Sequence, residues 1–371
     1  MNPRPTAQGK TGISRRQWLT AAATVGAGAV MATPEFAAPP ETTNLKLTLS
    51  CWNYDRTRAI QDGRVLLDGI DVTYLPLVIE ETFFRQARYH EFDASEMSLS
   101  SYVVSLFADK PQFIAIPIFP SRSFRHSGIY VNANAGIREP KDLIGKKVAC
   151  AEYQLTANVW IRGILNDEYK VPITSYTTYT GGLEEAGRTE KISLTLPPNV
   201  KVESISEGKT LSNMLETGEV DAMFTPRAPS SFTRGSGKVR RLFVNYADAE
   251  RDYYKRTKIF PIMHIVVIRK DVYERHPWIA RSLYKAFCEA KTRAIENMHI
   301  SNAHAYMLPW LAWEREQLKE IFASDWWPYG IEPNRHVLEA LLRYLQEQGL
   351  LKKPLKVEDI FAPSAVGEFK L

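Results

Sequence analysis

The chain has 371 residues, of which 44% are hydrophobic and 24% are charged, and its formal net charge is +5. This is an ordinary globular composition, and a core of this size usually divides into two domains or lobes. Beyond residue 38 the chain keeps 43 basic and 41 acidic residues. Such a near balance excludes the electrostatic footprint of a nucleic-acid-binding protein, so individual arginines would have to bind any anionic ligand.

The first 38 residues resemble a twin-arginine export signal. The pair Arg15-Arg16 precedes a short apolar stretch rich in alanine and glycine, and cleavage could follow Ala32 or Ala38. The stretch is too short and too rich in glycine for a transmembrane helix, and no later segment is apolar enough for stable membrane insertion. We therefore expect a periplasmic protein. A disordered tail on a cytoplasmic protein is the alternative.

Strand and helix patterns alternate after this segment. Period-two alternation and apolar runs predict strands, and amphipathic spacing predicts the helices between them. Strands are expected over 45–50, 70–75, 92–97 and 113–119, and helices over 57–60, 80–89 and 102–108. The last of these strands runs directly into Arg122, Arg125 and His126. Charged groups at the end of a buried strand lie where α/β sheets place their ligands.

The same alternation begins again after His126. Strands are expected over 128–131, 147–149 and 220–224, and helices over 153–166 and 210–216. The apolar stretch 259–268 mirrors 113–119 and is expected to return the chain to the first lobe. Long helices are expected over 278–298 and 335–348, with four tryptophans packed against them, namely Trp310, Trp313, Trp326 and Trp327.

Two crossing strands and a repeated strand–helix alternation predict an α/β protein with a two-lobed, type II periplasmic-binding-protein-like fold. We expect residues 45–125 and 260–371 to form one lobe and residues 126–259 the other. The cleft between the lobes is expected to hold a small molecule.

The cysteines and histidines give no metal-binding pattern. Cys51, Cys150 and Cys288 are far apart and cannot all pair within one chain, so buried thiols are favoured, with a Cys51–Cys150 disulfide as the alternative. The histidines have no tight ligand spacing, and the usual nucleotide, hydrolase and zinc motifs are absent from the sequence. We therefore expect neither a metal nor a cofactor.

Candidate site residues share one feature, a position at the end of a predicted strand or the start of a predicted helix. Those within residues 45–125 are Tyr54, Asp55, Arg56, Arg58, Glu96, Ser98, Ser100, Arg122 and Arg125. The others are His126, Tyr153, Gln154, Thr156, Asn158, Arg188, Arg227 and His264. A guanidinium binds a carboxylate through two parallel hydrogen bonds, and tyrosine suits an aromatic ring, so the set indicates a small aromatic carboxylate. The alternatives are that Arg56 and Arg58 are surface charges and that His264 is a hydrogen-bonded core histidine.

Six of these stretches resemble the 4,5-dihydroxyphthalate decarboxylase family, a branch of the type II binding-protein fold. They are residues 54–58, 91–101, 116–126, 152–160, 226–229 and 259–264, and the resemblance covers nearly all of residues 45–371. It implies a reaction that removes one carboxylate from 4,5-dihydroxyphthalate to give protocatechuate. The resemblance supplies no catalytic residue set.

The same candidate residues support two hypotheses about function. In a cofactor-independent decarboxylase, arginines hold the two carboxylates, a general acid protonates the ring, and a carboxylate polarises a hydroxyl. We expect Arg122, Arg125 and Arg227 to hold the carboxylates. His126 or His264 is expected to be the general acid, and Glu96 or Asp55 to polarise the hydroxyl. In a periplasmic solute-binding protein, the same arginines capture a carboxylate, and lobe closure signals to a transporter permease. The matched motifs favour the enzyme, and the export signal favours the binding protein.

Overall fold

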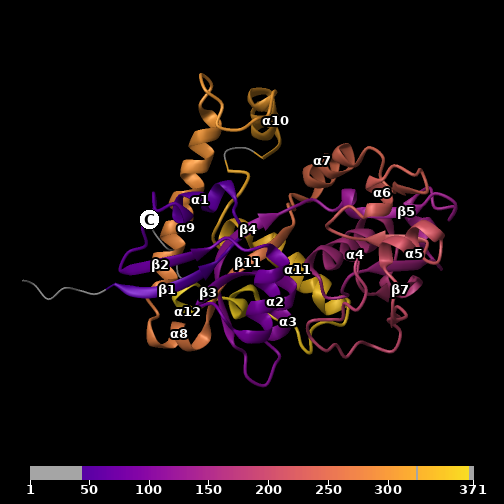
Figure 1. Ribbon diagram of the computed structural model, residues 1–371, viewed down its shortest axis with the longest axis horizontal. Coiled ribbons are helices and arrows are strands. Elements are labelled where there is room, and N and C mark those ends of the chain that lie inside the picture. The colour runs from indigo at the N-terminus through magenta and orange to yellow at the C-terminus, as the bar shows by residue number, and fades with distance from the viewer. Residues whose placement is uncertain (1–43, 323–324, 367–371) are drawn as a thin grey trace, which may run out of the picture. The chain divides into compact units, whose positions relative to one another are not determined.

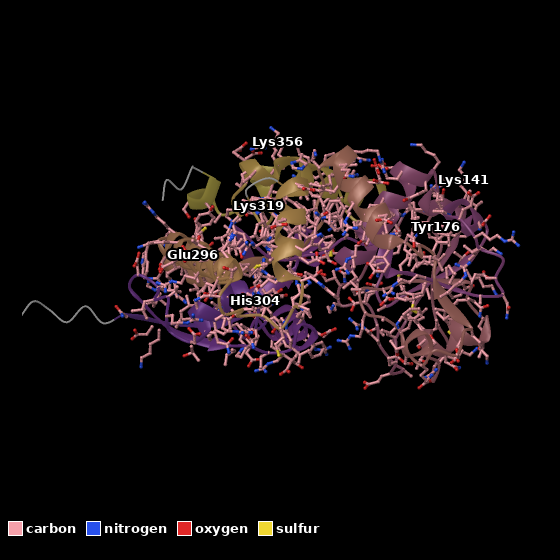
Figure 2. The ribbon with its side chains drawn as sticks, turned by 90° about the horizontal axis from the view of Figure 1, so that it is seen from above. Lys141, Tyr176, Glu296, His304, Lys319 and Lys356 are labelled. Carbon is pink, nitrogen blue, oxygen red and sulfur yellow. The ribbon has the colours of Figure 1, made fainter. Side chains whose placement is uncertain are left out.

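The computed structural model describes residues 44–322 and 325–366. The expected export segment, residues 1–38, lies outside the described residues. The described part contains two β-sheets, each covered by helices (Figure 1). Figure 2 adds the side chains, with Lys141 and Tyr176 belonging to the lobe of the second sheet and Glu296 to a helix of the first lobe.

The first sheet has the strand order β2-β1-β3-β11-β4. Strands β1, β2 and β3 are parallel to one another, and β11 runs antiparallel to both β3 and β4. The strands are β1 (Leu45–Ser50), β2 (Ile70–Leu75), β3 (Ala94–Ser98), β4 (Phe113–Arg122) and β11 (Ile262–Arg269). The parallel order brings the residues that follow β1 and β3 to one edge of the sheet.

The second sheet has the order β10-β5-β9-β6-β7-β8. Strands β6 to β9 are parallel, and β5 runs antiparallel to β9 and β10. The strands are β5 (Ile129–Asn132), β6 (Lys147–Cys150), β7 (Thr177–Thr180), β8 (Val202–Ser204), β9 (Ala222–Phe224) and β10 (Val239–Arg241). The lobe limits drawn from the sequence stay a prediction.

The two strands expected to cross between the lobes, β4 and β11, are neighbours in the first sheet. The register between them shifts on both sides of His264, which is a bulge in the ladder. The return strand begins at Ile262 rather than at Ile259, since Pro261 has no N–H to donate to the ladder.

Helices of the first lobe follow its strands closely. They are α1 (Asp55–Gln61), α2 (Ile79–Tyr89), α3 (Leu99–Ser105), α8 (Lys270–Arg275), α9 (Ile279–His299), α10 (Leu311–Phe322), α11 (Arg335–Glu347) and α12 (Pro363–Val366). Helices that follow strands of the second sheet are α4 (Thr156–Tyr169), α5 (Leu211–Thr217), α6 (Ser230–Thr233) and α7 (Tyr246–Thr257). None of the helices in the described part of the chain is both long and apolar enough to cross a membrane.

Helix α4 belongs to both hydrophobic cores. Its residues Val159 and Trp160 pack in the core of the first sheet, whereas Ile161 and Leu165 pack in a core of the second. A Cβ at Gly163 would lie 2.2 Å from the ring of Tyr344 in α11, so only glycine permits this approach of the two helices. Packing on both sides therefore fixes the first turn of α4 against β3.

The structure corrects two expectations. Trp310 and Trp313 do not pack against the long helices, because their side chains are 72% and 51% exposed, although Trp326 is buried. Cys51 and Cys150 are buried free thiols, so the alternative of a disulfide between them is wrong.

The sequence patterns did not predict strands β7, β8 and β10 or helices α7 and α10. The strands are only three or four residues long, and α7 buries a single residue, Tyr253, so neither kind of element shows a periodic apolar pattern.

Candidate active site

The site is built around Glu96, a fully buried carboxylate in β3. Its oxygens accept hydrogen bonds from the Tyr54 hydroxyl at 2.6 Å, the Trp52 amide at 3.1 Å and the Cys51 thiol at 3.5 Å. The Nδ1 atom of His264 lies 2.5 Å from the same carboxylate. Strands β1 and β3 are parallel neighbours, so the residues just after β1 necessarily lie beside Glu96.

These contacts set the ionisation of the cluster. Burial alone raises the pKa of Glu96, but the charge of His264 and the hydrogen bonds from His264, Tyr54 and Trp52 bring that pKa below its usual value. Burial and the neighbouring Glu96 raise the pKa values of Cys51 and Tyr54. At neutral pH the cluster therefore holds one carboxylate anion surrounded by protonated donors.

His264 is positioned to move a proton. The hydrogen bond to ionised Glu96 places a proton on Nδ1 of His264, which leaves Nε2 as the atom that can accept or donate. The ring packs edge-on against Phe83 with 4.9 Å between centroids, and its side chain is 15% exposed. A carboxylate behind an imidazole stabilises the imidazolium, which is the arrangement of a general acid or base. The alternative drawn from the sequence, a hydrogen-bonded core histidine, accounts for the bond of Nδ1 to Glu96. It does not account for Nε2.

Three hydroxyl groups join β3 to the start of α4. The Thr156 hydroxyl lies 2.8 Å from that of Ser98 and 2.9 Å from that of Ser100, and it accepts the Ser100 amide at 3.0 Å. The Ser100 hydroxyl also donates to the carbonyl of Gln154. Ser98 pairs with His264 across β3 and β11, so these hydroxyls lie next to the imidazole. At the start of α4 the amides of Asn158 and Val159 already donate to the carbonyl of Leu155, so only the amides of Thr156 and Ala157 could be offered to an anion.

Arg56 is a cation in contact with Tyr54, the residue whose hydroxyl donates to Glu96. Its guanidinium lies between the rings of Tyr54 and Trp327, at 4.0 and 4.2 Å from their centroids. It donates to the carbonyl of Pro120 at 2.6 Å and pairs with Asp55 at 3.0 Å. Arg56 is therefore an ordered, largely buried cation, and the alternative that it is a surface charge does not describe it. Arg58 is exposed and bonds to Asn53.

Arg122 and Arg125, at the end of β4 and just after it, have different surroundings from those of Arg56. Arg122 is buried and donates to the carbonyls of Phe260 and Pro328 at 3.1 and 2.8 Å and to Asn334. These bonds make it an internal brace of the first lobe, contrary to the expectation of a ligand carboxylate. Arg125 is half-buried and contacts the sulfur of Met263 at 3.0 Å. No carboxylate among the described residues forms an ion pair with Arg125.

His126 does not join the cluster. Its buried ring packs against Phe243, Tyr253 and Tyr169 in the second lobe, at 5.1, 5.5 and 6.0 Å between centroids. Burial, with a smaller effect of Arg256, lowers the pKa of His126 to about 4. A ring that stays neutral inside an aromatic pocket is a packing residue, contrary to its expected role as a proton donor.

The remaining candidates have partners elsewhere. Arg188 pairs with buried Glu152 at 2.5 Å, and exposed Arg227 pairs with Glu80 at 2.6 Å. Tyr153 donates to the carbonyl of Gln348, and Asn158 donates to that of Glu152. The side chain of Gln154 is buried, with no hydrogen-bond partner within normal distance among the described residues. The structure thus brings together Tyr54, Arg56, Glu96, Ser98, Ser100, Thr156 and His264.

Sequence reasoning missed four parts of the site. The Trp52 amide and the Cys51 thiol directly precede the motif at 54–58, so their position was a usable signal. Phe83 lies on the apolar face of α2, and Trp327 gave no signal because it reaches Arg56 only through the tertiary fold. Within residues 44–322 and 325–366, no group of three or more His, Cys, Asp or Glu is arranged to hold a metal ion.

The strand order and the crossing strands define a two-lobed α/β protein with a type II periplasmic-binding-protein-like fold. No family model matches the chain. Solved structures with similarity include a putative periplasmic sulfonate-binding protein from Methylobacillus flagellatus, with 14% identity and a TM-score of 0.49 over 87% of this chain and 93% of that one. An alkanesulfonate-binding protein from Xanthomonas axonopodis pv. citri has 13% identity and a TM-score of 0.46 over 88% and 99% of the two chains. The fold assignment rests on the strand order, and these structures add no argument about the ligand.

Two proteins described as 4,5-dihydroxyphthalate decarboxylase are much more similar in sequence. That of Comamonas testosteroni is 41% identical over 327 residues, which are 88% of this chain and 99% of that protein. That of Pseudomonas putida is 46% identical over 211 residues, which are 57% of this chain and 82% of that protein. The chain belongs to the 4,5-dihydroxyphthalate decarboxylase family.

Proposed function

We propose that this chain is a carboxy-lyase that converts 4,5-dihydroxyphthalate to protocatechuate and carbon dioxide. Membership of the decarboxylase family supplies the substrate class. The single observation that carries the proposal is the pairing of His264 with buried Glu96, because solute capture alone needs no charged carboxylate behind an imidazole.

The residues around this pair suit a hydroxylated aromatic diacid. Arg56, already stacked between aromatic rings, offers its guanidinium to a carboxylate of a planar ligand. Arg125, which has no carboxylate partner among the described residues, is the second cation in this proposal. The hydroxyls of Ser98, Ser100 and Thr156 offer hydrogen bonds to ring hydroxyls or to the second carboxylate.

Chemistry begins with proton transfer from Nε2 of the His264 imidazolium to the ring carbon that bears the departing carboxylate. The ring hydroxyl para to that carbon stabilises the resulting cation. The carbon–carboxylate bond then breaks, its electron pair restores the aromatic ring, and carbon dioxide leaves. Glu96 stabilises the imidazolium before the transfer, and solvent restores the proton of His264 afterwards.

The proposal is tested by incubating the purified full chain with 4,5-dihydroxyphthalate and following both compounds by mass spectrometry. We expect substrate to disappear with an equal appearance of protocatechuate and carbon dioxide. A complex that stabilises the protein thermally but returns all of the ligand unaltered contradicts the enzyme and supports the alternative of a solute-binding protein with a transporter permease as partner.

We further propose that residues 1–38 direct export of the chain through the twin-arginine route to the periplasm. The support is the Arg15-Arg16 pair followed by an apolar, alanine-rich stretch. Residues 1–43 fused to a reporter protein should deliver it to the periplasmic fraction, and lysine at both arginine positions should retain it in the cytoplasm. Equal cytoplasmic retention of both fusions contradicts this proposal.

A further inference from the structure

A cavity lies on the other side of β3 from Glu96 and His264. Its volume is about 580 Å³, within the usual range for a small-molecule site. It is bounded by the end of α2, by α3 and the turn that follows it, and by segments 191–195 and 349–352. Met97 lines it, and side chains alternate along a strand, so the flanking Glu96 and Ser98 point to the opposite face.

The lining of this cavity suits a ligand with an apolar body. Apolar residues are contributed by every bounding element, among them Met97, Val104, Phe113, Leu194 and Leu350. The cavity is a groove open to solvent rather than a sealed part of the hydrophobic core, because exposed Ala108 and Lys110 also line it. An accessible apolar groove of this size can bury one or two rings of a ligand.

The charges around the groove favour an anion. Lys110, Lys191 and Lys352 line it, against a single carboxylate, Asp109. Within the described residues no acidic side chain forms an ion pair with Lys110 or Lys352, and Lys352 donates only to the carbonyl of Phe107, at 3.1 Å. Two exposed ammonium groups that form no ion pair with a described residue therefore stand beside an apolar surface.

The groove also has a physical connection to the catalytic site. Lys191 lines the groove and pairs with fully buried Glu152 at 3.0 Å. Glu152 lies two residues before Gln154, whose carbonyl accepts the hydroxyl of Ser100. An anion in the groove would compete with Glu152 for the Lys191 ammonium. Glu152 is in the same short segment as Gln154, which holds the hydroxyl of Ser100.

We propose that this groove is a second ligand site, separate from the catalytic pair, for a small amphipathic carboxylate. The apolar body lies over Met97 and Val104, and the carboxylate lies at Lys110 and Lys352. The inference rests on the groove and its charges and is independent of the reaction proposed above.

The probe for the test is 1-naphthoate, titrated into the full chain by isothermal calorimetry. We expect saturable binding, weakened at least tenfold by Ala108→Trp, which fills the groove from an exposed position. The double variant Lys110→Gln, Lys352→Gln should also weaken binding about tenfold, the equivalent of 1.4 kcal/mol, since both charges are lost. The matched control, Lys201→Gln with Lys238→Gln, removes two exposed lysines outside the groove and should bind like the wild type.

Three results would overturn the proposal. One is the lack of saturable binding to the wild type. Another is equal binding by the wild type, Ala108→Trp and the double lysine variant. The third is loss of binding in His264→Asn with retention in Ala108→Trp, which would place the naphthoate in the catalytic site. Thermal unfolding of each variant checks that it is folded.

Discussion

At the scale of single residues, the account depends on a carboxylate that is buried yet ionised. Glu96 is 1% exposed and receives donors from three residues after β1 as well as from His264. Burying a charge is costly unless it is paired and hydrogen-bonded, so a protein retains such a group where its charge is used. In the proposed reaction its charge orients His264 and stabilises the imidazolium.

Glu96→Gln keeps the size of the side chain and removes its charge. We expect kcat to fall by about 100-fold or more with a small change in substrate affinity, since the loss is in proton transfer. Steady-state kinetics and a separate binding titration measure the two effects. The matched control is Glu81→Gln, an exposed glutamate of α2, which should behave like the wild type. A threefold or smaller loss of kcat in Glu96→Gln would contradict the role of the pair.

His126 gives a prediction about stability and pH. Its pKa is lowered to about 4 by burial, against 6.5 for a free histidine, so between these values the unfolded chain binds more protons than the folded one. Stability of the wild type should therefore fall as the pH drops from about 6.5 to 4, by up to roughly 3 kcal/mol. His126→Phe should lack this contribution and keep its kcat, as measured by urea unfolding at several pH values and by turnover at neutral pH. An unchanged pH dependence would show that the ring is not buried as described.

Sequence reasoning selected both members of the proposed catalytic pair but could not show that they contact each other. Glu96 and His264 are 168 residues apart and meet only because β11 inserts beside β3. The same reasoning placed His126 in the site, because a position just after a strand does not reveal that aromatic residues from α4, α7 and the segment after β10 enclose the ring. Arg122 failed for the same reason, since its acceptors come from distant loops.

At the scale of elements, α4 connects the packing of both lobes to the site. It packs in two cores, and its first residue, Thr156, holds Ser98 and Ser100. The helix was predicted from its pattern, whereas its partners were not, since contact with α11 depends on how the last third of the chain folds back.

Gly163→Ala tests the packing of α4 against α11. Alanine in a helix interior is otherwise favourable by about 0.5–1 kcal/mol, yet here its Cβ would meet the ring of Tyr344. We expect a net destabilisation of about 1–2 kcal/mol in urea unfolding, because overpacking costs about 1–3 kcal/mol. The double variant with Tyr344→Leu should be less sensitive to the alanine. A more stable Gly163→Ala protein would be inconsistent with the close approach.

Thr156 provides a test at the junction of α4 and β3. Thr156→Val removes a hydroxyl with three partners and leaves buried polar groups of Ser98 and Ser100 unpaired, at a cost of about 1–3 kcal/mol. We expect weaker substrate binding, seen as a higher KM, together with lower stability. Thr156→Ser keeps the hydroxyl and should restore both. Equal KM values for the three proteins would remove these hydroxyls from the substrate site.

At the scale of the whole molecule, the alternation of strands and helices was enough to predict a two-lobed α/β protein with two crossing strands. The sequence could not show that the exposed tryptophans of the segment around α10 stay in solvent, or that short strands complete the second sheet. Those features depend on contacts between distant parts of the described chain, and no local period reports them.

The decisive question is whether the residues around Glu96 and His264 only bind a ligand or also react with it. In the proposed function, binding and decarboxylation use the same cations and hydroxyls, and the Glu96–His264 pair is the feature that distinguishes them. A variant of His264 therefore separates the two functions within one pocket.

The most direct measurement compares the wild type with His264→Asn in deuterated water containing 4,5-dihydroxyphthalate. We expect the wild type to form protocatechuate with one deuterium at the carbon that lost its carboxylate. His264→Asn should bind the substrate with similar affinity and form product at least about 100-fold more slowly. Equal rates of labelled product from both proteins, or return of unaltered substrate by the wild type, would contradict the account.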